Sequence, residues 1–163
     1  MANTRQRRTS GFTLIELVMT VAILGLLATM VLPVAQLSAQ REKEKDLRSA
    51  LRDIRGALDA YKTAVDQGKL VSGHPSASGY PSSLRDLVDG IDDLGTAQAR
   101  KRYFLRRIPR DPFARDASLP AEESWGLRSY SSPPDNPRAG DDVYDVYSLS
   151  TGMGLNGIPY REW

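Results

Sequence analysis

The feature that most constrains this chain is an apolar run from Phe12 to Ala35, in which Glu16 is the only ionisable side chain. Because the run has 24 residues, it would form a helix about 36 Å long, enough to cross a hydrocarbon core of about 30 Å. A carboxylate in such a helix costs about 2.5–3.5 kcal/mol at the bilayer centre and less near its end. The run therefore predicts a membrane anchor, and Glu16 either reaches water at the headgroups or has a partner and a function.

The charges before the run predict how the anchor is oriented. Residues 1–11 contain Arg5, Arg7 and Arg8 and no acidic residue, which favours a cytoplasmic N-terminus and sends the chain after Gln36 to the outside. The alternative is an ordinary secretory signal, cleaved after Ala35 or Ala39. Such signals have apolar cores of about 7–15 residues, and this run is longer, so we favour a retained anchor.

The segment Arg7 to Glu16, R-R-T-S-G-F-T-L-I-E, resembles the processing and methylation motif of type IV pilins and pseudopilins. The resemblance implies that a prepilin peptidase cuts between Gly11 and Phe12 and N-methylates the new Phe12 terminus. Glu16 would then be the fifth mature residue, the position at which the family keeps a glutamate for assembly. This role is chemically reasonable, because a carboxylate in low dielectric needs a cation and the Phe12 amine of a neighbouring subunit can supply one.

Composition limits what the rest of the chain can be. About 128 residues follow the anchor, enough for one small domain. The formal charge is +2, but without the three leader arginines it becomes −1, which does not indicate a general polyanion binder. There are no cysteines and hence no disulfides. Many type IV major pilins close a C-terminal loop with a disulfide, so this absence favours the pseudopilin side of the family.

Residues 36–67 are predicted to continue the anchor helix. An apolar stripe, spaced four and three residues apart in turn, indicates one helical face packed on a core; it comprises Leu47, Leu51, Ile54, Leu58, Tyr61 and Val65. The charged residues 41–46 before it are predicted to be solvated, with Glu44 and Arg48 placed for a pair one turn apart. Anchor and extension together predict a helix of roughly 55 residues.

The remaining residues predict short elements joined by loops. Residues 68–81 are rich in Gly, Ser and Pro; Ser82 or Ser83 is then expected to cap a short helix to about Val88. Residues 125–130 and 143–149 are predicted strands. Between them and the short helix, residues 100–113 interleave basic and aromatic side chains. This basic strip fits a nucleic-acid surface, but we favour a structural segment with Tyr103, Phe104, Leu105 and Ile108 in the core.

These later segments are similar to the major, G-type pseudopilin of type II secretion systems. The similar segments are G-Y-P-S-S-L at residues 79–84, Y-F-L to P-F at 103–113, Y-D-V-Y-S-L at 144–149 and the final Trp163. That family usually binds calcium through aspartates in a C-terminal loop. Here residues 150–157 contain no carboxylate, and calcium needs six to eight oxygen ligands. Asp141, Asp142 and Asp145 could supply ligands, which leaves calcium as the alternative, but strand geometry sends neighbours to opposite faces. We therefore expect no metal site and no cofactor.

Catalysis has little support in the sequence. His74 is the only histidine and lies in a Gly- and Ser-rich loop, and no cysteine is available as a nucleophile. The acidic residues Asp111, Asp116, Glu122 and Glu123 fit turn formation better than a carboxylate pair. We therefore expect no enzymatic activity.

The sequence thus predicts an α+β, pilin-like subunit with four parts. They are a leader at 1–11, a transmembrane segment at 12–35, a helical extension at 36–67 and a globular periplasmic domain at 68–163. The resemblance implies a filament subunit of type II secretion, anchored once in the bacterial inner membrane. Its partners would be the prepilin peptidase, identical and minor pseudopilin subunits and the inner-membrane assembly platform. The alternatives are a subunit of a type IV or DNA-uptake pilus, and a membrane-anchored DNA binder using the basic strip.

Overall fold

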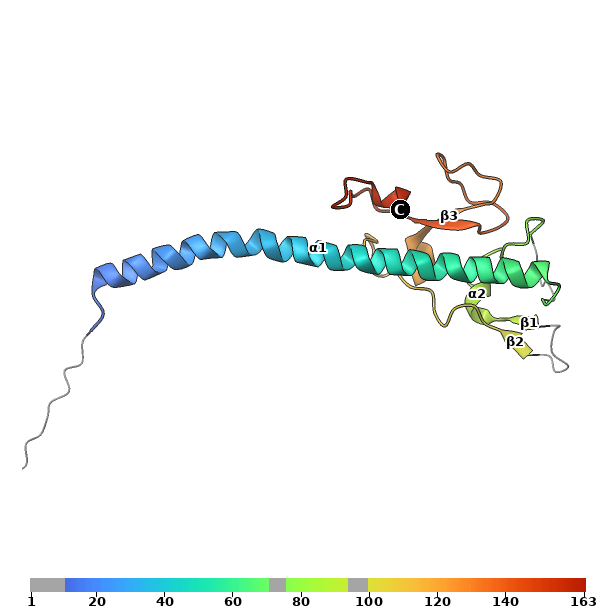
Figure 1. Cartoon of the computed structure of the whole chain (residues 1–163), viewed down its shortest axis with the longest axis horizontal. Helices are drawn as coiled ribbons and strands as arrows, with labels where there is room; N and C mark the ends of the chain where they lie inside the picture. The colour runs from blue at the N-terminus through green and yellow to red at the C-terminus, as the bar shows by residue number, and fades with distance from the viewer. Residues whose placement is uncertain (1–10, 71–75, 94–99) are drawn as a thin grey trace, which may run out of the picture. The chain divides into compact units, whose positions relative to one another are not determined.

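The computed structural model describes residues 11–70, 76–93 and 100–163 (Figure 1). It contains one long helix followed by short elements. In chain order these are α1 (Leu14–Asp66), α2 (Asp86–Asp89), β1 (Ile91–Asp93), β2 (Arg100–Arg102), the 3-10 helix η1 (Ala121–Ser124), β3 (Trp125–Arg128), β4 (Asp145–Ser148) and the 3-10 helix η2 (Tyr160–Glu162). The predicted α+β class, with a long N-terminal helix and small antiparallel sheets, is confirmed.

The long helix is continuous over 53 residues, close to the predicted length. The chain nevertheless divides into two compact units, Met1–Gln40 and Arg41–Trp163. The second unit, here called the head, contains the last part of α1 and all the later elements. The division falls inside α1, so one helix contributes to both units.

The core of the head lies along the predicted stripe of α1. Leu47, Leu51, Ile54, Leu58 and Tyr61 are buried, and Val65 is partly buried. Side chains from the later elements pack on this stripe, including Leu84, Leu87, Trp125, Val143, Val146 and Tyr160. Aromatic contacts add to it: the Tyr61 and Phe104 ring centroids are 5.4 Å apart, and the Phe113 and Tyr160 rings stack at 4.1 Å. The prediction that the stripe is a core contact is confirmed.

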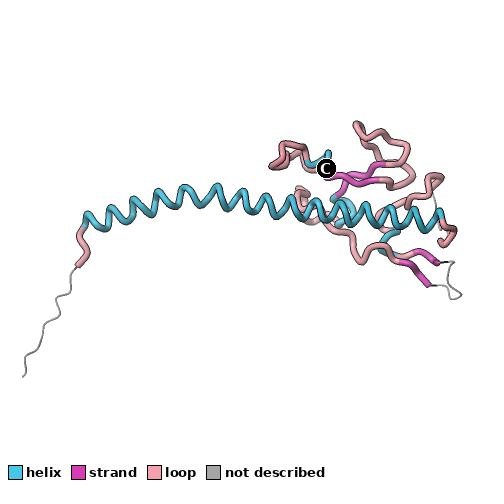
Figure 2. The backbone as a smooth tube through the Cα atoms, in the orientation of Figure 1, coloured by secondary structure: helices cyan, strands magenta, loops and turns pink. Residues whose placement is uncertain are grey.

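Two separate two-stranded antiparallel sheets flank the helix. In the first, β1 pairs with β2, with Asp92 opposite Lys101 and Asp93 opposite Arg100. In the second, β3 pairs with β4, from Trp125 opposite Ser148 to Arg128 opposite Asp145. Figure 1 shows β3 and the β1–β2 pair on opposite sides of the head part of α1, and Figure 2 shows that loops make up most of the chain between them. Strands were predicted at 125–130 and 143–149 and are confirmed in shorter form.

The predicted cap of the short helix is wrong. That helix, α2, begins at Asp86, and Arg85 is its N-cap without a side-chain hydrogen bond. Asp86 Oδ2 instead accepts the Ser82 hydroxyl at 2.9 Å and the Ser83 N–H at 3.0 Å. The aspartate is therefore the acceptor that organises this turn, and the serines are donors.

The prediction that Tyr103 enters the core is also wrong, since its side chain is 62% exposed. Phe104, Leu105 and Ile108 do pack against the core. Tyr103 follows the end of β2 and lies outside regular secondary structure, so strand alternation does not place its side chain. The Tyr103 ring covers Gly90, where an added Cβ would lie 2.6 Å from Tyr103 Cε1 and where φ is +76°.

Candidate functional site

Gly11, Phe12 and Glu16, the three residues singled out by the motif, surround the start of α1. Residues 11–13 have no regular secondary structure, and the helix begins at Leu14. Phe12 is 82% exposed. An added Cβ at Gly11 would meet no heavy atom within 4 Å. The bond between Gly11 and Phe12 therefore lies in an uncovered, non-helical segment of the kind that a peptidase needs.

Thr13, a residue that the sequence analysis did not single out, caps this helix. Its Oγ1 accepts the Glu16 N–H at 3.3 Å, and its carbonyl accepts the Leu17 N–H at 3.1 Å. Residues 13–16 read T-L-I-E, the S/T-x-x-E pattern of a capping box, so the signal was present in the sequence. Glu16 lies in the first turn, where a negative charge also complements the helix dipole. Glu16 thus has a local structural role available beside the predicted one in assembly.

The apolar side chains after Glu16 find no cover within the described part of the chain. Large examples are Val18, Val21, Leu24 and Leu27, all more than half exposed. Among the described residues, α1 is the one helix long and apolar enough to cross a membrane. Glu16 is exposed and makes no ion pair with any described residue. A helix that is apolar all round and unpartnered needs an apolar environment outside the subunit.

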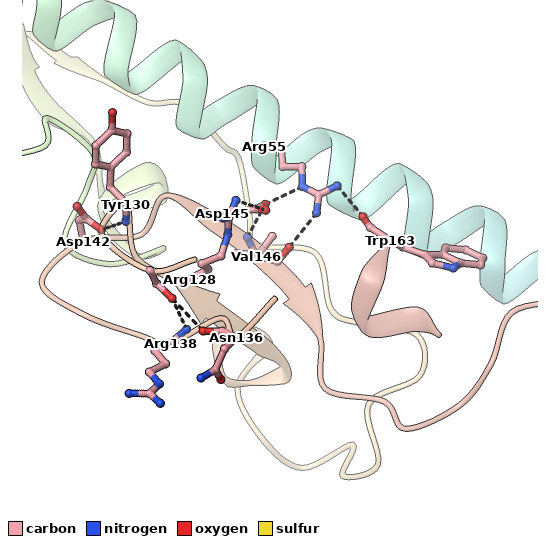
Figure 3. Close-up of polar contacts among 10 residues, drawn as sticks. Arg55, Arg128, Tyr130, Asn136, Arg138, Asp142, Asp145, Val146 and Trp163 are labelled. Carbon is pink, nitrogen blue, oxygen red and sulfur yellow. Dashed lines mark hydrogen bonds and ion pairs between the residues drawn. The ribbon is translucent and has the colours of Figure 1, made fainter. Parts of the chain in front are cut away.

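Within the head, Arg55 of α1 forms hydrogen bonds with the C-terminal segment (Figure 3). Its Nε donates to Asp145 Oδ1 at 2.7 Å, and its two terminal nitrogens donate to the main-chain oxygens of Trp163 at 3.0 Å and Val146 at 3.2 Å. Arg128 approaches the other oxygen of Asp145 at 3.3 Å. One guanidinium thus joins the helix, β4 and the last residue of the chain.

Glu44 forms a second attachment, and its predicted place in a solvated charge run is wrong. Its side chain is buried, and Oε1 accepts the Leu155 N–H at 2.8 Å and the Tyr160 hydroxyl at 3.1 Å. Sequence spacing could not find this role, because the partners lie 111 and 116 residues away. The arginine predicted to pair with it, Arg48, places its guanidinium 4.4 Å from the centre of the Trp163 ring.

The loop at residues 150–157 is organised by hydrogen bonds. Thr151 Oγ1 accepts from Arg115 at 2.6 Å, and the Gly154 N–H donates to the Ile158 carbonyl at 2.9 Å. Two of the three carboxylates named as possible calcium ligands have other partners. Asp142 accepts the Tyr130 N–H at 2.8 Å and the Ser78 hydroxyl, and Asp145 holds Arg55. The described residues contain no group of three or more His, Cys, Asp or Glu placed to hold a metal ion.

Parts of the basic strip have structural roles. Arg100 and Lys101 lie in β2 opposite aspartates. Arg110 donates to the Asp116 carbonyl at 3.1 Å and to the Leu119 carbonyl. Arg106 and Arg107 are exposed. The strip therefore contributes to strand pairing and loop closure, and its basic side chains, including Arg106 and Arg107, are solvent-exposed.

Three of the four acidic residues considered for catalysis, Asp111, Asp116 and Glu122, each have their own hydrogen-bond partners. Asp111 is buried and accepts the Phe113 N–H at 2.7 Å and the Ser148 hydroxyl at 2.5 Å. Asp116 accepts the N–H and the hydroxyl of Ser118, and these hydrogen bonds hold the pKa of Asp116 below its usual value. Hydrogen bonding to Glu122 raises the pKa of Arg85. These contacts are structural, and two of them join residues 37 positions apart in the chain. His74 lies outside the described residues.

Comparison with known proteins finds one matching family model and several similar proteins. Residues 6–32 match the family model described as "Prokaryotic N-terminal methylation motif". The chain is 32% identical over 145 residues to "Type II secretion system core protein G" of Pectobacterium carotovorum subsp. carotovorum, covering 83% of each chain. It is 31% identical over 146 residues to the protein of the same name in Escherichia coli K12, covering 86% of this chain and 92% of the relative. The Vibrio cholerae protein of that name is 33% identical over 115 residues, covering 69% and 70%.

No solved structure matches the chain. Family membership rests on the sequence relatives and the motif, and the α+β fold described above is consistent with both. The chain belongs to the type II secretion system core protein G family, the G-type pseudopilins, and is a structural subunit of a pseudopilus.

Proposed function

We propose that this subunit enters the inner membrane with its N-terminus in the cytoplasm and its head in the periplasm. It is then cleaved before Phe12, methylated there, and drawn into a filament that drives folded proteins across the outer membrane. Identical subunits form most contacts, minor pseudopilins join them, and the inner-membrane assembly platform adds subunits by using a cytoplasmic ATPase. Its work is mechanical and involves no catalysis.

The observation that carries this proposal is the uncovered apolar part of α1, with a single carboxylate in its first turn. In the membrane, lipid surrounds this apolar surface. In a filament the same surface packs against other copies, which offer it an equally apolar environment. The relatives' names favour secretion over the pilus alternative.

Glu16 is proposed to pair with the Phe12 amine of the adjacent copy. Two variants separate this role from helix capping, because Glu16→Gln keeps a side chain that can complete the capping box but removes the charge. Glu16→Ala removes both. If the charge pairs between subunits, both variants should insert and be cleaved normally but should give few multimers and little export.

The test is to express each variant in cells lacking the native copy, then measure cleavage, sheared or cross-linked multimers, and secretion. Thr13→Ser, which retains the cap, is the matched control. Normal multimers with Gln but not with Ala would assign Glu16 to capping. Normal multimers and export with Ala would remove the assembly role, and failed cleavage would assign Glu16 to the peptidase.

A further inference from the structure

The solvent-facing side of α1 in the head has two charged edges. At about 100° per residue, Arg41, Arg48 and Arg52 fall within about 40° of one another, and Asp46 and Asp53 form a second group. All five are exposed. The two groups lie roughly 120° apart, and the buried stripe lies on the remaining third of the helix. We call them the basic edge and the acidic edge.

The basic edge borders a groove between α1 and the C-terminal segment, with a volume of about 340 Å³. Its lining includes Arg48, Arg52, Leu51, Ile158 and Trp163. Arg48 lies over the Trp163 ring, whereas Arg52 makes no hydrogen bond or ion pair with the described residues. Glu162 also lines the groove and is exposed. Because arginines line the groove, it can accept the ends of side chains from another molecule next to positive charge.

The acidic edge lacks partners of its own. Asp46 and Asp53 make no ion pair with the described residues, while Glu42 on the same side pairs with Lys45 at 3.5 Å. The two edges cannot neutralise each other within one subunit, because they point in directions about 120° apart on one rigid helix. Their charges are available to another molecule.

Small residues lie between the edges. Ser49, Gly56 and Ala60 follow one another along the outward face, and an added Cβ at Gly56 would meet no heavy atom within 4 Å. A glycine inside a helix is destabilising relative to alanine, and nothing packed within the subunit requires this one. Its absence of a side chain permits close approach of a neighbouring helix.

We infer that the basic edge of one head docks against the acidic edge of a second copy of this chain. The two surfaces are complementary in charge and lie on different sides of the same helix, so the contact is head-to-tail around the filament and repeats without closing. This inference rests on the proposed function, which supplies the parallel neighbours. It adds a second contact in the head, independent of Glu16.

The test uses two complementary charge-reversed copies of the full chain, expressed in cells lacking the native copy. Copy A has Arg41→Glu with Arg52→Glu, and copy B has Asp46→Arg with Asp53→Arg. Arg48 is kept in copy A because its guanidinium lies over the Trp163 ring, and the net charge of that edge still becomes negative. Alone, each places like charges at the contact, and cross-linked multimers should fall about fivefold. When the two copies are expressed together, the reversed basic edge of copy A meets the reversed acidic edge of copy B, and the native basic edge of copy B meets the native acidic edge of copy A. Both contacts then join opposite charges, so multimers containing both copies should return to near the wild-type level.

The controls reverse equally exposed charges elsewhere on the head. Arg106→Glu with Arg107→Glu matches copy A, and Asp92→Arg with Asp141→Arg matches copy B. Both controls should assemble as the wild type does. Because the chain has no cysteine, a copy with Arg52→Cys and a copy with Asp46→Cys can also be joined by a short bis-maleimide linker, with Asp92→Cys in place of Asp46→Cys as the control.

The outcomes separate the inference from the proposed function. If the wild type forms no multimers and its loss leaves export normal, the proposed function is wrong. If the wild type assembles but copy A is no worse than its control with Arg106→Glu and Arg107→Glu, the edge contact is wrong and the function stands. The contact is equally wrong if mixing A with B gives no more multimers than the two copies give separately.

Discussion

The two parts of α1 have similar apolar residues with opposite surroundings. In the anchor, Leu24 and Ile23 are more than half exposed, whereas in the head Ile54 is 0% exposed and Leu58 is 1% exposed. The head stripe occupies one helical face and is covered by loops and strands of the same chain. The anchor is apolar on all sides, and its cover must come from lipid or from other subunits. The subunit thus covers the apolar side chains of α1 in the head but not those in the anchor.

The largest expected effect on this comparison comes from blocking cleavage of the leader before Phe12. Gly11→Val should abolish processing, because the peptidase needs the unhindered backbone that glycine offers at the cut. Gly25→Val is the matched control, since neither position has a neighbour within 4 Å of an added Cβ. Mass and N-terminal sequence of the membrane-extracted protein give the result. We expect methylated Phe12 in the control and an uncut chain in Gly11→Val.

A wild-type N-terminus at Gln36 or Gln40 would instead establish an ordinary signal peptide. The anchor would then be lost from the mature protein. The exposed apolar residues of the anchor could then play no part in assembly of the mature subunit.

A core truncation should affect only the head. Ile54→Ala removes a fully buried side chain and should lower the free energy of unfolding by about 2–5 kcal/mol. Ile23→Ala, the same substitution on the exposed anchor, should leave unfolding of the head unchanged. Trp125 is buried in the head core, so denaturant unfolding of the full chain in detergent can be followed by its fluorescence. An equal loss in both variants would show that the anchor and head unfold together.

The Arg55 attachment should have a smaller effect. Arg55→Ala removes three hydrogen bonds from a guanidinium that is 38% exposed. We expect the free energy of unfolding of the head to fall by about 1–2 kcal/mol, less than for loss of a fully buried charged group, because solvent screens the Arg55 guanidinium. Arg52→Ala, one turn away and without a partner among the described residues, should cost almost nothing. Limited proteolysis should release the C-terminal segment faster in Arg55→Ala only, and similar rates in both variants would contradict the attachment.

The sequence predicted those features that depend on local pattern. The length of α1, its buried stripe and strands β3 and β4 follow from apolar spacing at periods of 3.6 and 2. Strand β1 was not predicted, because Ile91-Asp92-Asp93 has one apolar residue and two that are depleted in strands. Tyr103 was misplaced because its ring packs over Gly90 instead of entering the core, and aromatic character alone does not reveal that contact.

The processing and assembly residues can be proposed from the sequence, whereas the tertiary contacts of the head cannot. Gly11, Phe12 and Glu16 are close in sequence and form a motif. Glu44 and Arg55 act through partners about 90 to 116 residues away, and charge patterning along a helix does not reveal such partners. The helix cap at Thr13 could have been predicted from its capping-box spacing.

The smallest expected effect is that of calcium on the head. Residues 150–157 contribute no carboxylate, and hydrogen bonds from Leu155 and Tyr160 to Glu44 already hold this region to α1. A ligand that binds only the folded state, at a hundred times its dissociation constant, stabilises that state by about 2.7 kcal/mol. Such a gain would raise the melting temperature of the head visibly. We expect millimolar calcium to give no more shift than magnesium, measured by Trp fluorescence on the full chain. An upward shift specific to calcium would mean that oxygen ligands gather in the folded head despite the loop's lack of acids, and Asp142→Asn and Asp145→Asn would then identify which carboxylates supply them.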